Sequence, residues 1–228
     1  MVKDCFIIID GTDRIGKSTQ IKLLNDYFKK NHQKTFVTRC IGGPQGIPEY
    51  DYMQSLRDII FNNSLPAYAE ERIIALASEL NLCMIHQLKN KRVYNCFIQD
   101  RGVLSHIAYG LTKGNSRNHL EHYYKQVLYQ INNVIPPTIN ICMLPDDFKW
   151  FQKRLEKKSE TTQRHLELEN IKFQKNVCKN MLKEFALSKR KQSKFLNIKN
   201  SQILLLKEED SIEQVHQKII NIITTRLS

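Results

Sequence analysis

Apolar residues along the chain gather in short runs that alternate with longer stretches of helical spacing. The run at 5–9 is continuously apolar and ends at Asp10-Gly11, a pattern typical of a central parallel strand. Together with this run, the pattern predicts strands at 5–9, 35–38, 93–99, 138–144 and 202–206. Helices are predicted between and after them, at 17–31, 48–62, 67–89, 102–112, 118–133, 167–190 and 211–226.

The regular alternation of strands and helices predicts the fold class. Alternating elements form βαβ units, in which the strands are parallel and the helices cover both faces of the sheet. We therefore expect an α/β fold of three layers, with a five-stranded parallel sheet flanked by helices. The sequence shows no internal repeat and no linker, so one domain is expected over 1–228.

The segment Gly11–Ser18 (GTDRIGKS) matches the phosphate-loop pattern GxxxxGK[ST] between a predicted strand and a predicted helix. Its glycines let the backbone turn tightly around phosphates, Lys17 brings a positive charge to the β- and γ-phosphates, and Ser18 offers a hydroxyl to Mg²⁺. The helix that follows points its positive end at the anion. The motif predicts the P-loop NTPase fold and ATP binding by Gly11, Thr12, Asp13, Arg14, Ile15, Gly16, Lys17, Ser18 and Thr19.

Two charged residues inside this loop narrow the chemistry. Asp13 cannot bind a phosphate, so we expect its carboxylate to accept a hydrogen bond from a donor such as a sugar hydroxyl. Arg14 could reach the transferring phosphoryl group, because phosphoryl transfer is catalysed mainly by positioning and charge neutralisation. A local surface salt bridge between the two is the alternative.

A second group of candidates follows the third predicted strand. Asp100-Arg101 ends that strand, and ligands of parallel sheets bind at the carboxyl ends of the strands, so the pair should face the loop. We expect Asp100 to hold Mg²⁺ or its water and Arg101 to clamp a second phosphate, unless the two form a buried ion pair. Ser105 and Tyr109 follow at helical spacing and could contact a base and a sugar.

Charge and cysteine content change this picture little. The net charge of +12 suits nucleotide phosphates, but lysines on solvated helix faces explain most of it, and the basic tract 189–194 lacks interleaved aromatics, so nucleic acid is not an expected partner. The six cysteines include no CxxC pair, which disfavours zinc and favours a reducing compartment. Without a signal-peptide pattern or an apolar run of roughly 18 residues, we expect no membrane association and a cytoplasmic location, in the host if the protein is viral.

Three segments resemble the thymidylate kinase family. They are 6–20 (FIIIDGTDRIGKSTQ), 38–43 (TRCIGG, a degraded form of TREPGG) and 100–109 (DRGVLSHIAY), and their spacing agrees with that family. The resemblance covers nearly the whole chain. It implies that ATP, with Mg²⁺, donates its γ-phosphoryl group to a deoxynucleoside monophosphate such as dTMP.

The resemblance also implies roles for residues around the acceptor. Asp13 would bind its 3′-hydroxyl, and Arg39 and Arg101 would hold its phosphate. Ser105 would lie near the base, and Tyr109 would crowd the sugar C2′ and disfavour ribose. The catalytic group would then consist of Arg14, Lys17, Asp100 and Arg101.

Two further implications concern larger parts of the chain. The charged segment at 146–166 would be a helical lid over ATP, with Arg154 near the adenine or the phosphates and Arg164 as a weaker candidate. The family is commonly dimeric, which implies a homodimer through the apolar helix faces at 48–90.

The predicted base pocket departs from the family pattern. The aromatic residue that would stack on thymine appears as Leu76, and the arginine after it appears as Leu80. The Glu of TREPGG is Cys40, and Gly102 follows the DR pair where the family usually has an aromatic or His. The base is therefore left open, and a different one could be read by Ser78, Glu79 or Asn81.

Two alternative functions fit part of the pattern. A deoxynucleoside kinase would use a carboxylate base at the end of the first strand, a position that Asp10 occupies. A nucleotide- or nucleic-acid-binding relative without catalysis would explain the altered base pocket. The charged pair inside the phosphate loop favours the monophosphate kinase over both.

Overall fold

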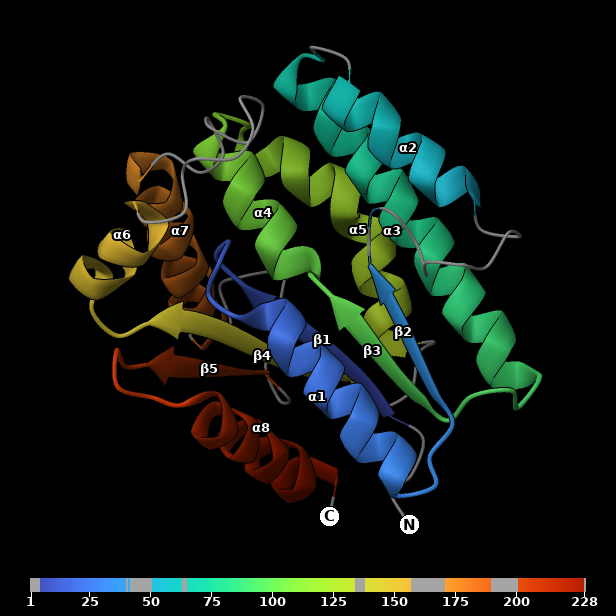
Figure 1. The fold of residues 1–228 in the computed structure, drawn as a ribbon. Helices are drawn as coiled ribbons and strands as arrows, with labels where there is room; N and C mark the ends of the chain where they lie inside the picture. The colour runs from blue at the N-terminus through green and yellow to red at the C-terminus, as the bar shows by residue number, and fades with distance from the viewer. Residues whose placement is uncertain are drawn as a thin grey trace.

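In the computed structural model, the described residues are 5–39, 41, 51–62, 65–133, 138–156, 171–189 and 201–227. A five-stranded parallel sheet forms the centre, with strand order β2-β3-β1-β4-β5 (Figure 1). Its strands are β1 (Cys5–Gly11), β2 (Thr35–Arg39), β3 (Cys96–Asp100), β4 (Thr138–Pro145) and β5 (Ser201–Leu206). The helices are α1 (Lys17–Lys30), α2 (Asp51–Asn62), α3 (Ala67–Asn90), α4 (Val103–Thr112), α5 (Arg117–Asn133), α6 (Phe148–Glu156), α7 (Ile171–Lys189) and α8 (Ile212–Leu227).

Side chains of β1 alternate between two helical layers. Ile7 and Ile9 pack with α1 and α8 in one cluster, whereas Phe6 and Ile8 pack with α3, α4 and α5 in another. Residues one apart on a strand point to opposite faces, so an unbroken apolar run is what a strand covered on both faces requires. The predicted three-layer α/β fold is confirmed.

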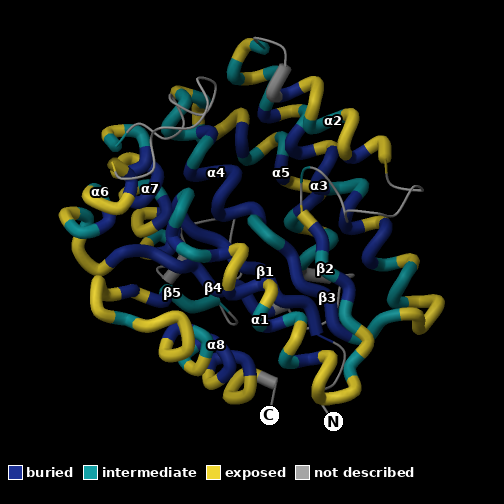
Figure 2. Tube along the Cα trace, in the orientation of Figure 1, coloured by how far each residue is buried: buried dark blue, intermediate teal, exposed yellow. Residues whose placement is uncertain are grey.

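Burial is deepest in the central strands, which are dark blue in Figure 2, while the outer faces of the helices are exposed. No side chain from Cys5 to Ile9 is more than 2% exposed. Fully burying one large aliphatic side chain stabilises a protein by about 1.5–3 kcal/mol. The core therefore anchors β1, whose carboxyl end carries the phosphate loop.

The third strand is shorter than the sequence predicts. It begins at Cys96, not at 93, because Val93 lies in the turn that follows α3, where its N–H donates to the carbonyl of Leu88 at 3.2 Å. Arg92 has a φ of 54° at this turn, which no strand residue adopts. In the sheet, Ile9 on β1 pairs with Asp100 on β3, so the carboxyl ends of these two strands lie side by side.

Parts of the predicted lid and loops lie outside the described residues. Helix α6 occupies the first part of the segment 146–166, and 157–166 with Arg164 fall outside. The same holds for Cys40, for 42–46 and for 190–194. Among the helices that the structure describes, none is both long and apolar enough to cross a membrane.

Candidate active site

The loop between β1 and α1 turns through two glycines. Gly11 and Gly16 have φ angles of 144° and 107°, which side-chain-bearing residues rarely adopt. A Cβ on Gly11 would lie 2.3 Å from the carbonyl oxygen of Met143 on β4, so no larger residue fits there. The chain can thus pass sharply from the sheet into the N-terminus of α1, where free backbone N–H groups favour an anion.

Lys17 lies beneath this loop and is buried. Its ammonium donates a hydrogen bond to the carbonyl oxygen of Thr12 at 2.6 Å, which holds the side chain across the loop. Burial and the guanidinium of Arg101 lower the pKa of Lys17 to about 8, although nearby carboxylates oppose the shift. Because a desolvated cation is costly, it gains strongly from an anionic ligand such as a triphosphate.

The carboxylate of Asp13 is engaged by three side chains. Arg101 pairs with one oxygen, and the hydroxyl of Tyr109 and the amide of Gln174 donate to the other at 2.7 and 3.2 Å. Burial raises the pKa of Asp13, but Arg101, Lys17 and these hydrogen bonds outweigh it and lower that pKa overall. Asp13 is therefore an anion that orders the loop against α4 and α7.

Gln174 was not predicted from the sequence. It is fully buried on α7, and its amide oxygen also accepts the backbone N–H of Asp13 at 3.1 Å. A glutamine within an amphipathic helix, 161 residues from its partner, carries no local signal. Only the packing of α7 beside the loop shows its role in positioning Asp13.

Asp100, the last residue of β3, and Arg101, which follows it, take separate partners, so the alternative of an Asp100–Arg101 ion pair is wrong. The Nε of Arg39 lies 3.3 Å from Oδ2 of Asp100, while Arg101 pairs with Asp13 and lies 4.8 Å over the ring of Tyr109. Arg101 has a φ of 68°, and its backbone N–H donates to the carbonyl of Ile9 at 3.0 Å. This turn directs its side chain toward the loop.

The metal candidates Ser18 and Asp100 line the same cavity. Oδ1 of Asp100 is buried and has no hydrogen-bond partner within the described ranges. Magnesium prefers carboxylate, hydroxyl and water oxygens, so this donor set fits the ion.

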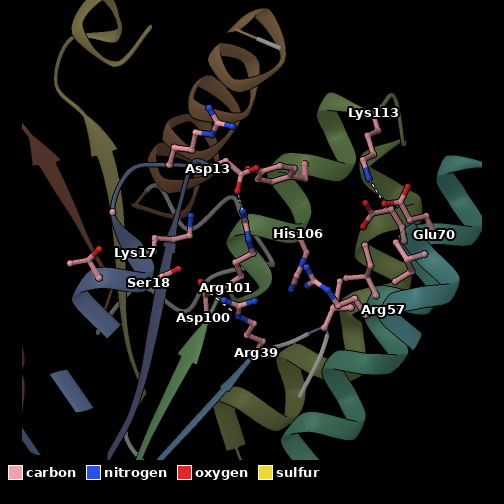
Figure 3. Close-up of a pocket in the computed structure, with 18 of the residues that line it drawn as sticks. Asp13, Lys17, Ser18, Arg39, Arg57, Glu70, Asp100, Arg101, His106 and Lys113 are labelled. Atoms are coloured by element: carbon pink, nitrogen blue, oxygen red, sulfur yellow. Dashed lines mark hydrogen bonds and ion pairs between the residues drawn. The ribbon is translucent and has the colours of Figure 1, made fainter. Parts of the chain in front are cut away.

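A cavity of about 500 Å³ opens beside the loop and joins the candidates (Figure 3). The cavity is lined by Asp13, Arg14, Gly16, Lys17, Ser18, Thr19, Arg39, Ile41, Arg57, Ile60, Glu70, Glu71, Ile74, Asp100, Arg101, His106, Tyr109, Lys113 and Arg154. Predicted residues from the phosphate loop, α1, β2, the end of β3, α4 and α6 therefore meet in one place. Gly11, Thr12 and Ile15 do not line it, so their contribution to the loop is its shape.

Arg57 on α2 also lines the cavity, although no sequence pattern predicted it as a site residue. Burial and the guanidinium groups of Arg39 and Arg101 lower its pKa. Neighbouring cations lower a pKa only when they are close, so Arg57 lies near two other guanidinium groups, in a place suited to a multiply charged anion. Arg57 lies in an ordinary amphipathic helix, so no motif singles it out.

Ser105 does not line the cavity and is therefore not placed to contact a base there, contrary to the prediction. It is fully buried, and its hydroxyl donates to Oδ1 of Asp10, which also accepts the backbone N–H of Gly102 at 2.8 Å and of Ser105 at 3.1 Å. Asn140 donates to the other oxygen of Asp10 at 3.0 Å. Asp10 thus caps the N-terminus of α4 from the sheet.

Packing explains why position 102 is a glycine, where the family usually has an aromatic residue or His. A Cβ at this position would lie 2.5 Å from Cγ2 of Ile8 on β1. The aromatic or His of the family pattern has no room here.

The residues suggested for base reading on α3 also point elsewhere. Leu76 is 50% exposed and does not line the cavity, so it cannot stack on a base there. The hydroxyl of Ser78 donates to the carbonyl of Ile74 at 2.8 Å, and Asn81 donates to Gln99 at 2.9 Å. Ile74 is the apolar residue of α3 that lines the cavity, and because it lies two residues before Leu76 it is on nearly the opposite side of the helix.

Arg14 and Arg154 both line the cavity. Nη1 of Arg14 donates to the carbonyl of Leu155 on α6 at 3.2 Å. The loop and the described part of the lid segment are therefore connected. The roles of both arginines toward ATP stay predictions.

A glycine-turned phosphate loop with a buried lysine, facing clustered arginines across a cavity, defines a P-loop phosphotransferase. Comparisons with known proteins agree. A family model described as thymidylate kinase matches residues 9–219. The chain belongs to the thymidylate kinase family, and it is an ATP-dependent kinase that phosphorylates a deoxynucleoside monophosphate.

Individual relatives are distant but cover the whole length. A thymidylate kinase of Sulfurimonas denitrificans is 23% identical over 220 residues, which cover 95% of this chain and 97% of the relative. One of Kosmotoga olearia is 26% identical over 220 residues, 94% and 93% of the two chains. The crystal structure of a thymidylate kinase from Ehrlichia chaffeensis matches the fold with a TM-score of 0.67 at 18% identity, over 97% of this chain and 99% of that one.

Proposed function

We propose that the chain transfers the γ-phosphoryl group of ATP to the 5′-phosphate of dTMP and forms dTDP. The observation that carries the proposal is the distribution of charge in the cavity. Lys17 of the phosphate loop lies at one side, and Arg39, Arg57 and Arg101 face it from β2, α2 and the end of β3 (Figure 3). Two phosphate groups can thus be bound within one cavity.

On the donor side, the phosphate loop and Lys17 bind the β- and γ-phosphates. Ser18 and Asp100 would hold Mg²⁺, which when bound neutralises phosphate charge. Arg14, at the edge of the loop, contributes positive charge where the phosphoryl group is transferred. Arg154 on α6 lies at the ATP side of the cavity.

On the acceptor side, Arg39, Arg57 and Arg101 bind the monophosphate. The attacking oxygen of that phosphate is already anionic, so the reaction needs positioning and charge neutralisation and no strong general base. Asp13 and Tyr109, joined by a hydrogen bond of 2.7 Å, orient the deoxyribose. Exclusion of water by closure of the lid segment would prevent hydrolysis of ATP.

The same geometry argues against a deoxynucleoside kinase. Such an enzyme needs a carboxylate base at the substrate hydroxyl, and Asp10 is fully buried with both oxygens accepting hydrogen bonds from α4 and β4. Asp10 is therefore a structural cap.

Steady-state assays of ADP release, with ATP·Mg²⁺ and either dTMP or thymidine, test the proposal. We expect turnover with dTMP and none above background with thymidine. Turnover with thymidine alone would establish the nucleoside kinase, and binding of dTMP without turnover would establish the non-catalytic alternative.

The proposal extends to assembly and location. Tyr52 and Ile59 on α2 and Tyr68 and Leu76 on α3 are exposed, and such apolar faces support a homodimer through these helices. Sedimentation equilibrium tests this, and a monomer at micromolar concentration would contradict it. The free thiols of Cys5, Cys96, Cys142 and Cys178 support a reducing cytoplasm.

A further inference from the structure

Two buried polar side chains line the cavity at the end away from the phosphate loop. Glu71 on α3 is 0% exposed and His106 on α4 is 6% exposed. Figure 3 shows His106 across the cavity from Lys17, between Arg101 and the Glu70–Lys113 pair. This end carries no phosphate-loop residue, so it is where the base of an acceptor bound through its phosphate would lie.

Each of these side chains has one atom without a hydrogen-bond partner among the described residues. The atoms are Oε1 of Glu71 and Nε2 of His106. Leaving a buried polar atom without a hydrogen bond destabilises a protein, so native proteins keep few such atoms. Two in one cavity indicate that a ligand completes their hydrogen bonds.

The surrounding residues hold both groups in place. The hydroxyl of Tyr124 donates to Oε2 of Glu71 at 3.2 Å, and its ring stacks on His106 with centroids 6.0 Å apart and an interplanar angle of 5°. A Cβ on Gly110 would lie 3.0 Å from Cδ of Glu71 and 3.2 Å from Oε1. A glycine inside a helix is less favourable than alanine. At position 110 it leaves room for the carboxyl group.

Charge decides which bonds these groups can make. Burial and the nearby Arg101 and Lys113 lower the pKa of His106 to about 3, so its imidazole is neutral and one nitrogen can donate. Glu71 presents an acceptor oxygen in either protonation state. Lys113 pairs with Glu70, and Ile60 and Ile74 supply apolar walls for a flat ring.

We propose that Glu71 and His106 read the edge of the acceptor base and select bases with a ring N–H beside a carbonyl group. The ring N–H donates to Oε1 of Glu71, and Nε2–H of His106 donates to the carbonyl oxygen. Thymine, uracil and guanine present this pair. Cytosine and adenine present a bare ring nitrogen beside an amino group, so both bonds are lost. The inference rests on the proposed monophosphate kinase activity and names how its acceptor is chosen.

The test is the kcat/KM of the full chain for dTMP, dUMP, dGMP, dCMP and dAMP at saturating ATP·Mg²⁺. We expect the best of the first three to exceed dCMP and dAMP by about 10- to 100-fold, the range that a pair of base-edge hydrogen bonds provides. Activity with thymine and uracil but not guanine still supports the selection and adds a size limit. Preference for dCMP or dAMP would overturn it.

Glu71→Gln tests the residue, because an amide can turn its N–H₂ toward the bare nitrogen of cytosine. We expect the dTMP/dCMP ratio to fall about tenfold, mainly through KM. Glu79→Gln is the matched control, since Glu79 lies two turns further along α3 and does not line the cavity. Its ratio should equal that of the parent protein.

His106→Phe keeps a ring to stack on Tyr124 and removes the donor. We expect the kcat/KM for dTMP to fall about tenfold, and this variant decides the matter if Glu71→Gln does not fold in a thermal melt. Turnover of dTMP with parent-like ratios in folded variants overturns the inference and leaves the proposed function standing. Failure of the parent protein to turn over any of the five nucleotides overturns both.

Discussion

The two ends of the cavity are built on opposite principles. At the phosphate end, charges are already paired within the protein, as in Arg101 with Asp13 and Arg39 with Asp100. At the base end, Glu71 and His106 keep one buried atom each without a partner among the described residues. Charge neutralisation binds any nucleotide, whereas a neutral hydrogen-bonding edge distinguishes one base from another.

The largest effect is expected at the phosphate end. Lys17→Ala removes the buried cation of the phosphate loop, and removing one charge-stabilising group from a phosphoryl-transfer site should lower kcat about 1,000-fold. The fold should survive, because the variant deletes a buried charge. The kcat for dTMP and the circular dichroism of the variant check both. Retention of more than a tenth of the activity would mean that Lys17 does not stabilise the transferring phosphate.

Arg57→Ala separates acceptor binding from catalysis. A charge-assisted hydrogen bond contributes about 1.5–3 kcal/mol, so the KM for dTMP should rise about 30-fold while the KM for ATP stays unchanged. Arg72→Ala, on the exposed face of α3 and outside the cavity, is the matched control. Equal KM values for dTMP in the two variants would remove Arg57 from the phosphate end.

The base end of the cavity should affect how the free energy of unfolding depends on pH. Burial raises the pKa of Glu71 to about 7, and the neighbouring carboxylate of Glu70 adds to this rise. Lys113 and the hydrogen bond from Tyr124 lower the pKa but do not outweigh the burial. The contribution of Glu71 to stability is therefore complete below about pH 4.5, the ordinary value, and is lost as the pH rises through about 7. Urea unfolding should show the parent losing about 2 kcal/mol relative to Glu71→Gln between pH 5 and pH 8. Parallel pH profiles would show that Glu71 is not buried as an acid.

The smallest effect is a pH dependence of base choice. A protonated Glu71 can donate to the bare ring nitrogen of cytosine, and an ionised one cannot. The dTMP/dCMP ratio of kcat/KM should therefore rise up to about tenfold from pH 6 to pH 8 in the parent and stay flat in Glu71→Gln. A rise in both proteins would assign the titration to another group.

The sequence predicted the phosphate end far better than the base end. A phosphate loop is a local pattern, since its glycines, Lys17 and Ser18 follow one another and the strand and helix around them are readable from periodicity. Asp100-Arg101 was found because parallel strands end at one edge of the sheet. These predictions depend only on short segments.

The base end is assembled from separate helices and could not be read in that way. Glu71 and His106 come from α3 and α4, and each sits in an ordinary helical pattern. The same is true of Arg57 on α2, the phosphate-end residue that no motif predicted. Leu76 was chosen by its position in the family pattern. Each residue along a helix advances about 100° around the axis, so Leu76 lies on the exposed face while Ile74, two residues earlier, lines the cavity. Ser105 was misassigned because its partner Asp10 is 95 residues away in the sequence and is buried on the central strand β1.

A competition assay tests directly whether the protein phosphorylates a monophosphate and which base it prefers. The full chain is incubated with ATP, Mg²⁺ and equal amounts of dTMP, dCMP and thymidine, and the products are followed by mass spectrometry. We expect dTDP as the main early product, little dCDP and unchanged thymidine. Consumption of thymidine, or dCDP formed as fast as dTDP, would contradict it.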